Sequence, residues 1–278
     1  MGQQMNRQGR RTVFYVSDRT GISVETLGRG LLSQFAGMEF SQIALPFIDT
    51  EDKARAAVAE INAVAASGER PLVFSTQVRP ELGAILKTCQ GLYLDFFAAF
   101  MGRLEAELHQ ISSHSIGLSH GLHDEQRYDT RIDAVNFALS CDDGIGIQNY
   151  SAADVVVVGV SRSGKTPTCL YLAMQYGVRA ANYPLTEEDF EQQRLPAALN
   201  PHRARLVGLT ITAERLQQIR HERRPNSPYA SLAQCQYEVR QLQKLLEREQ
   251  VPSLDSTHMS IEEIAASIVH ERGLTRRR

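Results

Sequence analysis

The stretch Asp154-Val-Val-Val-Val-Gly-Val-Ser-Arg-Ser-Gly-Lys-Thr-Pro167 decides the fold of the C-terminal half of this chain. It opens with four consecutive valines, Val155 to Val158, and a continuous β-branched run is typical of a parallel strand buried on both faces. Gly159 to Thr166 then match G-x-x-x-x-G-K-[ST], the pattern of a phosphate-binding loop. The stretch therefore predicts a central strand that leads into a nucleotide-phosphate site.

A helix is expected directly after this loop, over residues 168–176. Leu170 and Met174 are predicted to face the sheet, with Leu172 as a further candidate. Pro167 fits the first helical turn, where a missing N–H costs little. An ordinary glycine-rich turn after a buried strand is the alternative, and the flanking strand and helix favour the phosphate site.

The residue types of the loop suit the binding of phosphate. Gly159 and Gly164 can adopt positive φ, which lets backbone N–H groups point at phosphate oxygens. Lys165 can reach the terminal phosphates, and the Thr166 hydroxyl can hold Mg²⁺. The predicted nucleotide-binding residues are Gly159, Val160, Ser161, Arg162, Ser163, Gly164, Lys165 and Thr166. The loop alone does not specify the nucleotide or the reaction.

Composition is that of an ordinary globular protein. The 278 residues are 42% hydrophobic and 22% charged, with a formal net charge of −2, which gives no electrostatic case for nucleic acid. No apolar run approaches the ~20 residues that span a membrane, and the polar, basic residues 1–11 are not a secretory signal. The four scattered cysteines fit neither a disulfide framework nor a zinc site. A cytoplasmic protein is expected.

Apolar runs alternate with amphipathic stripes in both halves, which predicts the α/β class with parallel sheets. We expect a flexible arm over 1–11, an N-terminal α/β domain over 12–110, a linker with functional loops over 111–150 and a phosphate-loop, kinase-like domain over 151–278. In the first domain, a helix over 22–35 is expected to bury the stripe Val24, Leu27, Leu31 and Phe35.

A long helix is predicted over residues 230–250. Its apolar positions alternate at intervals of three and four: Leu232, Cys235, Val239, Leu242 and Leu246. This spacing fits packing on the helix's own sheet and equally a coiled-coil-like contact in a homodimer. Further along the chain, Ser260-Ile-Glu-Glu263 predicts a capping box that opens the last helix.

Acidic side chains follow or precede two predicted strands. Asp18 lies in the turn 17–21 at the rim of the first sheet, where it can position a metal, a phosphate group or a proton, or belong to an ordinary turn. Asp142 and Asp143 precede the valine strand, where they can hold Mg²⁺, act as a base toward a hydroxyl, or form a solvated turn. Thr210 stands at the strand end where many phosphate-loop enzymes keep a metal-binding acid.

Basic and histidine side chains are weaker candidates. Arg220, Arg223 and Arg224 can bind phosphate or form a solvated helix end. His114, His120 and His123 match no standard zinc spacing, and no metal site is predicted from them.

Several stretches together resemble one family, the bifunctional Ser/Thr kinase and phosphorylase that regulates phosphoenolpyruvate synthase or pyruvate, phosphate dikinase. The matching residues span nearly the whole chain, from about Thr12 to Leu274. They are Phe14 to Gly21 with Glu25, Pro71 to Phe74, His120 to Leu122, Asp142 to Gly144, Gly159 to Pro167, Ala180 to Pro184, Gly208 to Ile211 and Arg223 to Ala230.

The resemblance implies an unusual pair of reactions. Such proteins phosphorylate a threonine of the target with ADP as donor. They also remove that phosphoryl group with inorganic phosphate as acceptor, which gives pyrophosphate. Gly164-Lys165-Thr166 resembles the branch that regulates the synthase. Lys165 and Thr166 would then be catalytic, with Asp142, Asp143 and Asp18 as candidates for orienting the acceptor threonine or phosphate, and Mg²⁺ as an optional cofactor.

Two other classes of function remain open from the sequence. One is an ATP-using kinase of small molecules, and the other is a nucleotide-dependent switch that binds a partner without modifying it. The donor nucleotide and the transfer of label distinguish them. Phosphoenolpyruvate synthase is the expected protein partner; neither nucleic acid nor a membrane is expected, and a homodimer is left open.

Overall fold

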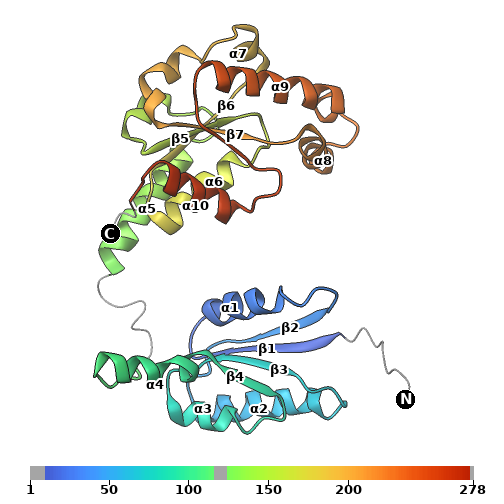
Figure 1. The fold of residues 1–278 in the computed structure, drawn as a ribbon, viewed down its shortest axis with the longest axis vertical. Coiled ribbons are helices and arrows are strands. Elements are labelled where there is room, and N and C mark those ends of the chain that lie inside the picture. The colour runs from blue at the N-terminus through green and yellow to red at the C-terminus, as the bar shows by residue number, and fades with distance from the viewer. Residues whose placement is uncertain (1–9, 116–123, 276–278) are drawn as a thin grey trace. The chain divides into compact units, whose positions relative to one another are not determined.

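The structure is a computed structural model that describes residues 10–115 and 124–275. The chain divides into two compact units, Met1–Gly121 and Leu122–Arg278. Each unit carries its own parallel sheet (Figure 1). Both units are mixed α/β, as the alternation of apolar runs and amphipathic stripes predicts.

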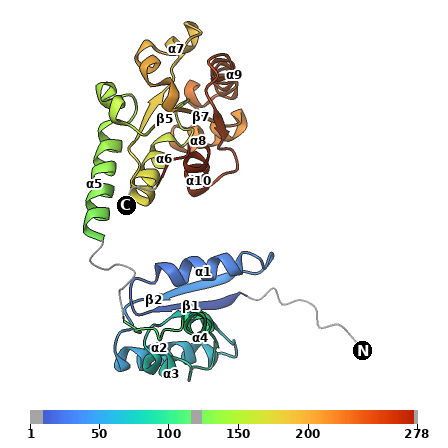
Figure 2. The same cartoon turned by 60° about the vertical axis from the view of Figure 1, so that its left-hand side comes forward.

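The N-terminal unit alternates strands and helices. Its elements are β1 (Arg11–Ser17), α1 (Ile22–Leu32), β2 (Phe40–Leu45), α2 (Glu51–Ala65), β3 (Leu72–Thr76), α3 (Pro80–Leu86), β4 (Leu92–Asp95) and α4 (Phe96–Leu108). The four strands are parallel in the order β2-β1-β3-β4, with Val13 of β1 level with Leu72 of β3. Every connection is therefore a crossover, and helices lie on both sides of this sheet (Figures 1 and 2).

The predicted apolar stripe of the first helix is wrong in three of its four positions. Val24 is buried, but Leu27, Leu31 and Phe35 are each at least half exposed. The helix instead buries Val24, Gly28 and Leu32 against the sheet. The reason is that Gly28 brings the backbone of α1 close to the Tyr15 and Phe74 rings, and this turns the larger side chains away.

We predict that Gly28→Ala destabilises the N-terminal unit. A Cβ at this position would lie 2.5 Å from the Tyr15 ring and 3.0 Å from the Phe74 ring, so the packed face of α1 must move. Overpacking of this kind costs ~1–3 kcal/mol in the free energy of unfolding, measured by urea denaturation. Gly30→Ala is the matched control, because nothing lies within 4 Å there, and it should raise stability by up to ~1 kcal/mol. Equal stabilities for the two variants would contradict this account of the packing.

The C-terminal unit is a second doubly covered sheet. Its elements are α5 (Asp124–Ser140), β5 (Val155–Gly159), α6 (Lys165–Tyr171), β6 (Ala180–Pro184), α7 (Glu187–Glu191), β7 (Leu206–Thr210), α8 (Ala213–Arg223), α9 (Leu232–Arg248), β8 (Ser253–Asp255) and α10 (Ile261–Glu271). Short 3₁₀ segments occupy Ile147–Ala152, Ala197–Arg205 and Pro228–Ala230. The strands are parallel in the order β6-β5-β7-β8.

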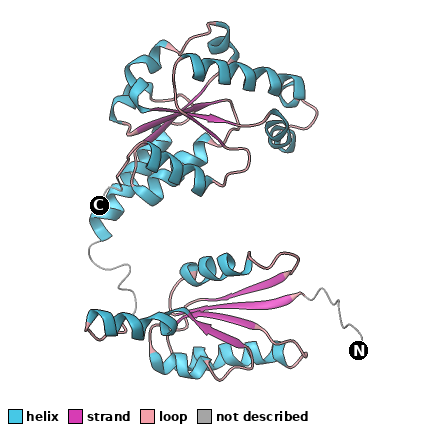
Figure 3. Cartoon of the chain, in the orientation of Figure 1, coloured by secondary structure: helices cyan, strands magenta, loops and turns pink. Residues whose placement is uncertain are grey.

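The four valines of β5 form the centre of this sheet, as predicted. All are fully buried, and β5 pairs with β6 on one side and β7 on the other. Val155 and Val157 face a core shared with α5, α6 and α10, whereas Val156 and Val158 face a core shared with α7, α8 and α9. Figure 3 shows helices on both faces of the magenta strands. Because successive side chains of a strand point to opposite faces of the sheet, the four valines are divided between the two cores.

The helix after the loop differs from its prediction. It begins at Lys165, three residues early, and continues from Tyr171 into a π-helical turn over Leu172–Tyr176. Leu172 is buried and Leu170 partly so, but Met174 is 55% exposed. The hydrogen bonds of a π turn span five residues instead of the four of an α-helix, so the turn shifts the last positions around the axis and takes Met174 off the inner face.

The apolar positions of the long helix pack on the unit's own sheet. Cys235, Val239, Leu242 and Leu246 are buried in the core shared with β5 and β7, and Leu232 packs against it. The alternative of a dimer contact through this seam is therefore wrong. The capping box of the last helix is confirmed, since Ser260 accepts the Glu263 N–H while Glu263 accepts the Ser260 N–H.

The segment expected to be a linker contributes to both units. Residues 111–115 belong to the N-terminal unit, and α5 packs on the C-terminal unit, against β6 and the π-helical turn. Residues 1–9 of the expected arm and 116–123, which include His120 and His123, lie outside the described residues. All four cysteines are unpaired. Within residues 10–115 and 124–275, no helix combines the length and apolar character needed to cross a membrane.

Candidate phosphate-loop site

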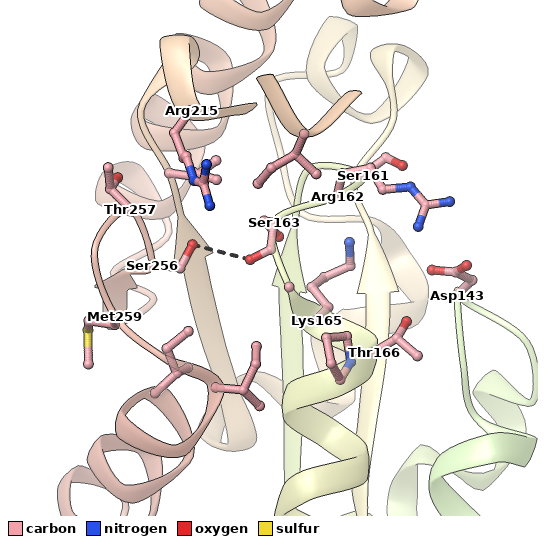
Figure 4. Close-up of a pocket in the computed structure, with 16 residues that line it drawn as sticks. Asp143, Ser161, Arg162, Ser163, Lys165, Thr166, Arg215, Ser256, Thr257 and Met259 are labelled. Atoms are coloured by element: carbon pink, nitrogen blue, oxygen red, sulfur yellow. Dashed lines mark hydrogen bonds between the residues drawn. The ribbon is translucent and has the colours of Figure 1, made fainter. Parts of the chain in front are cut away.

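The predicted phosphate loop joins the carboxyl end of β5 to the start of α6 and lines a pocket of about 370 Å³. Residues 161–167 form one wall of this pocket (Figure 4). Ile211, Ser256 and Thr257 come from the loops after β7 and β8, and Arg215 and Ile261 come from the first turns of α8 and α10. The pocket thus lies beyond the carboxyl ends of the strands, where open parallel sheets bind their ligands.

The two glycines of the motif serve different purposes. Gly164 has φ of 95° and caps α6, a conformation that few other residues adopt. Gly159 does not have the positive φ that the motif suggested. It is needed because a Cβ there would lie 2.5 Å from the Leu209 carbonyl oxygen of the neighbouring strand. The first glycine therefore allows β5 and β7 to come together beneath the loop.

Lys165 is the buried cation of the pocket, which Arg162 and Arg215 also line. Its side chain is buried, and its Nζ donates to the Val160 carbonyl oxygen at 2.9 Å, across the inside of the loop. Burial lowers the pKa of Lys165 to about 8, against the opposing effect of the nearby Asp143 carboxylate. Among the described residues, the Val160 carbonyl oxygen is the one hydrogen-bond acceptor of this buried ammonium, and an anionic phosphate would compensate its charge better.

We predict that the affinity for ADP falls as pH rises above about 8. The free protein loses the Lys165 proton there, whereas bound phosphate favours the charged form, so binding must take up a proton. Affinity should drop by up to ~10-fold per pH unit, measured by calorimetry between pH 7 and pH 10. Lys165→Ala should bind weakly with little pH dependence. A wild-type affinity that stays constant over this range would contradict the predicted role of Lys165.

Two side chains, one at the end of the loop and one in β6, hold Asp142 in place. Its Oδ1 accepts the Thr166 hydroxyl at 2.8 Å and the Asn182 side-chain amide. Asn182 is fully buried in β6, and its own Oδ1 accepts the Asp143 N–H at 3.1 Å. The Asn182 side chain thus holds both acidic residues in place. Asp142, from the segment that precedes β5, therefore places a carboxylate beside the Thr166 hydroxyl, whereas the end of β7 carries Thr210.

Asp143 faces the pocket itself. It has φ of 48°, and its side chain lines the cavity opposite Lys165. Figure 4 shows the Asp143 carboxylate and the Arg162 guanidinium on the same side of the loop. Asp143 is also the charged group that most favours the protonated form of Lys165. Of the two adjacent acids, one is therefore engaged by the loop and the other is open to a ligand.

Arg220 does not belong to a phosphate-binding cluster. Its guanidinium is fully buried and donates to both carboxylate oxygens of Glu238, at 2.9 and 2.6 Å. It also donates to the Ser161 carbonyl oxygen at 3.0 Å and lies 4.0 Å from the centre of the Tyr229 ring. The Tyr229 hydroxyl in turn donates to the Ser161 Oγ at 2.8 Å.

This arrangement orients the loop. Carbonyl and N–H of a trans peptide point in opposite directions, so fixing the Ser161 carbonyl toward Arg220 turns the Arg162 N–H to the other side of the loop. Arg162 itself has φ of 75°, and successive N–H groups around such a residue form a concave anion site. Arg220 is therefore a positioning residue. The prediction that it could seat phosphate directly is wrong, because Glu238 already neutralises it.

We predict that Arg220→Gln lowers the free energy of unfolding by ~3–5 kcal/mol, since it leaves Glu238 buried and uncompensated. Tyr229→Phe keeps the ring over the guanidinium and removes one hydrogen bond to Ser161, so it should cost only ~1 kcal/mol while weakening ADP binding several-fold. Urea denaturation and calorimetry measure the two effects. Arg223→Gln, on the exposed face of the same helix, is the control. An Arg220→Gln protein as stable as that control would contradict the assignment.

The far wall of the pocket comes from residues that sequence patterns did not single out. Ser256 donates to the Ser163 carbonyl oxygen at 3.2 Å and to the Thr210 carbonyl oxygen at 2.8 Å, so it ties β7 and the loop together (Figure 4). The Ser163 Oγ is buried and has no hydrogen-bond partner among the described residues. A ligand oxygen in the pocket would satisfy it.

No sequence pattern identifies the hydrogen-bond partners of several residues that support this site. Asn182 is visible as an amide within an apolar strand, which hints at a specific hydrogen bond. Glu238 and Tyr229 look like ordinary surface residues in the sequence. Asp18 lies in the N-terminal unit, in a pocket of its own, and among the described residues no three histidine, cysteine or acidic side chains converge as a metal site.

A parallel sheet whose central strand runs through a glycine-rich loop into a helix defines the phosphate-loop class of α/β proteins. The chain belongs to the kinase/pyrophosphorylase family, whose model matches residues 13–269. This match covers both units and includes the phosphate loop, both adjacent acids and the turn around Asp18. The family places the chain among phosphotransferases.

Curated relatives resemble the chain over almost its full length. A protein of Ectopseudomonas mendocina named phosphoenolpyruvate synthase regulatory protein is 53% identical over 96% of this chain and 99% of its own length. Proteins of the same name from Pseudomonas putida F1 and Pseudomonas aeruginosa LESB58 are each 52% identical, over 96% and 97% of this chain and 99% of their own lengths.

Proposed function

We propose that the chain transfers the β-phosphoryl group of ADP to a threonine of phosphoenolpyruvate synthase, and removes it again with inorganic phosphate. The observation that carries this proposal is the pocket at the phosphate loop, where Lys165, Asp142-bound Thr166 and the open carboxylate of Asp143 converge. Phosphoryl transfer mainly needs positioning and neutralisation of charge, and these residue types supply both.

Each residue has a distinct role in the proposed transfer. The loop N–H groups and Lys165 bind the diphosphate, so that the β-phosphoryl group lies at the mouth of the pocket. Asp143 accepts the proton of the threonine hydroxyl as that oxygen attacks phosphorus. Thr166 and Asp142 have the oxygen donors that Mg²⁺ prefers and would hold it; the ion would neutralise phosphate charge. Asn182 keeps Asp142 and Asp143 in position.

The same cleft serves the removal of phosphate. An oxygen of inorganic phosphate attacks the phosphorus of phosphothreonine, the bond from phosphorus to the threonine oxygen breaks, and pyrophosphate forms. The leaving threonine oxygen takes a proton, which Asp143 donates in its acid form. One phosphate loop supports this sharing, since no second strand, glycine loop and lysine of this kind occurs in the sequence.

The target is proposed from the names of the relatives, all of which refer to regulation of phosphoenolpyruvate synthase. Pyruvate, phosphate dikinase is the alternative target, and an ATP-using small-molecule kinase or a non-catalytic nucleotide switch is the alternative function. A reducing, cytoplasmic setting is proposed with it, in keeping with four unpaired cysteines. Whether the chain forms a homodimer does not enter this proposal.

The proposal is tested by the choice of donor and acceptor. The full-length protein is incubated with the synthase or the dikinase, and with β-labelled ADP or γ-labelled ATP. We expect label on a threonine of the synthase from ADP only. Label from ATP alone would support an ordinary kinase, label only on the dikinase would move the target, and tight ADP binding without any labelled protein would support a switch.

A further inference from the structure

The adjacent acids Asp142 and Asp143 lie in a tight turn at the edge of the phosphate-loop pocket. The Asp142 carbonyl oxygen accepts the Ile145 N–H at 2.9 Å, which closes the turn 142–145. Its two central residues, Asp143 and Gly144, have φ of 48° and 77°, and a type I′ turn has positive φ at both central positions. Ile145 is thus held two residues from the acid that lines the pocket.

Hydrogen bonds to β6 hold this turn in place. Gly144 donates its N–H to the Asn182 carbonyl oxygen at 3.1 Å, and Asn182 donates its own N–H to the Cys141 carbonyl oxygen at 3.1 Å. The side-chain oxygen of Asn182 accepts the Asp143 N–H. A Cβ at Gly144 would lie 3.5 Å from the Tyr183 ring, so the turn also packs on the end of the strand. The turn therefore keeps one position relative to the pocket.

The side chain of Ile145 is exposed to solvent on this turn. It is 68% exposed, whereas Ile147, two residues further on, packs against the core that contains Cys141 and Tyr150. Among the described residues, no apolar cluster includes Ile145. A single exposed apolar residue is ordinary on a protein surface. Ile145 differs from such residues in its position, because it is fixed beside the acid that the proposed transfer uses as its base.

The pocket has an apolar wall at the end away from Asp143. Ile219 of α8, Ile264 of α10 and Met259 between β8 and α10 contribute to this wall. Figure 4 shows Met259 and Asp143 on opposite sides of Lys165. A nucleobase would fit the apolar wall, and the diphosphate would then cross the loop with its terminal phosphoryl group toward Asp143. The acceptor hydroxyl would therefore enter from the side of the turn 142–145.

A protein acceptor must contact the surface around Asp143. A base accepts a proton from a hydroxyl when the two oxygens are about 2.6–3.2 Å apart. The threonine hydroxyl is only two bonds from Cα, so this contact brings the backbone of the acceptor and its neighbouring residues to the turn 142–145. A small-molecule acceptor would make no such demand on the surface outside the pocket. Ile145 is an exposed apolar side chain at that place.

We propose that the turn 142–145 docks the acceptor segment of the target protein, and that Ile145 packs against an apolar side chain next to the acceptor threonine. This inference rests on the transfer reaction proposed above and concerns how its protein substrate is recognised. Contact with Ile145 removes apolar surface of both proteins from water, and the fixed turn then holds the threonine hydroxyl at Asp143. Ile145 thus determines the affinity for the protein substrate and takes no part in the chemistry.

The first test compares Ile145→Ser with the wild type in the full-length protein. Initial rates of labelling from β-labelled ADP are measured over a range of concentrations of whichever protein the wild type labels. We expect the KM for that protein to rise at least ~5-fold. The kcat and the KM for ADP should stay within ~2-fold, because the lost contact is the same in the ground state and the transition state. Ile145→Leu keeps an apolar side chain and should restore most of the affinity.

Met174→Ser is the matched control for this comparison. Met174 is a half-exposed apolar residue of the same unit and does not line the pocket. Its replacement should leave the KM for the protein substrate unchanged. Ile145→Ser should unfold at the same urea concentration as the wild type and bind ADP equally well, since Ile145 belongs to no core.

A cross-linking measurement identifies the contact directly and does not depend on rates. The photoreactive residue p-benzoylphenylalanine replaces Ile145 or Met174 in the full-length protein, which is irradiated with the labelled target protein. The products are digested and the joined fragments are identified by mass spectrometry. We expect position 145 to join the fragment that carries the labelled threonine, and position 174 to join no fragment of the target.

Three results would overturn this inference. They are an unchanged KM in Ile145→Ser, an equal rise in Met174→Ser, and a cross-link from position 145 to a fragment without the labelled threonine. Each of them leaves the labelling of the target by the wild type intact, so the proposed function would stand. A wild type that labels no protein would instead refute the proposed function, and this inference with it.

Discussion

Lys165→Ala should reduce phosphoryl transfer from ADP, and also the phosphate-dependent release of pyrophosphate, by at least ~100-fold. Lys165 is the buried cation inside the loop, and both proposed reactions develop charge on a phosphoryl group at that position. The measurement is the initial rate of each reaction with the full-length protein and its protein substrate. The loss should appear in kcat as well as in the affinity for ADP, because the contact strengthens further in the transition state.

The unfolding curve of Lys165→Ala distinguishes a chemical loss from a structural one. Lys165 is poorly compensated in the free protein, so its removal should leave stability unchanged or raise it. Lys244→Ala, which removes an exposed lysine of the same unit, should keep both activities. A well-folded Lys165→Ala protein that lost transfer from ADP and kept full release of pyrophosphate would show that the two activities use separate sites.

Asp143→Asn should lower kcat by ~10²–10⁴-fold in both directions, with little change in the KM for ADP. The amide keeps the size of the side chain but cannot accept the threonine proton or return it. The backbone of residue 143 should remain in place, since Asn182 holds it through the N–H and not through the carboxylate. Initial rates over a range of ADP and synthase concentrations give the two constants.

Asp142→Asn provides the internal comparison for this assignment. Its oxygen faces Thr166 and Asn182, so the change should weaken the alignment of the loop and any dependence on Mg²⁺ more than it removes a base. Glu214→Gln, an exposed acid on α8, should behave as wild type. If Asp142→Asn abolished kcat while Asp143→Asn kept it, the roles of the two acids would have to be exchanged.

The sequence was sufficient for the central strand and the loop, because these rest on local patterns. Four β-branched residues in a row have few alternatives to a doubly buried strand, and the glycine-lysine motif needs only its immediate neighbours. The alternation of strands and helices likewise predicted two parallel sheets. Local periodicity failed in α1, where Gly28 and not a large apolar residue contacts the sheet. A pattern of apolar residues does not reveal where the backbone of a helix comes so close to the sheet that large side chains have no room between them.

The hydrogen bonds that hold the site residues in place could not be predicted, because they join residues far apart in the chain. Arg220 meets Ser161 across 59 residues, and Asn182 meets Asp142 across 40. Sequence reasoning found Asp142 and Asp143 as a pair of acids but left their roles open. The structure separates them, since one is bonded to Thr166 and the other lines the pocket. The three-dimensional fold, and not the motif, determines which acid is open to a ligand.

The central claim is that one phosphate-loop site moves a phosphoryl group from ADP to a threonine and then to inorganic phosphate. A single pulse and chase tests it. The synthase is labelled from β-labelled ADP by the full-length protein, the nucleotide is removed, and unlabelled inorganic phosphate is added. The account predicts that the label leaves the synthase as pyrophosphate, and only when phosphate is present. Release of the label as orthophosphate, or its release without added phosphate, would show hydrolysis and contradict the account.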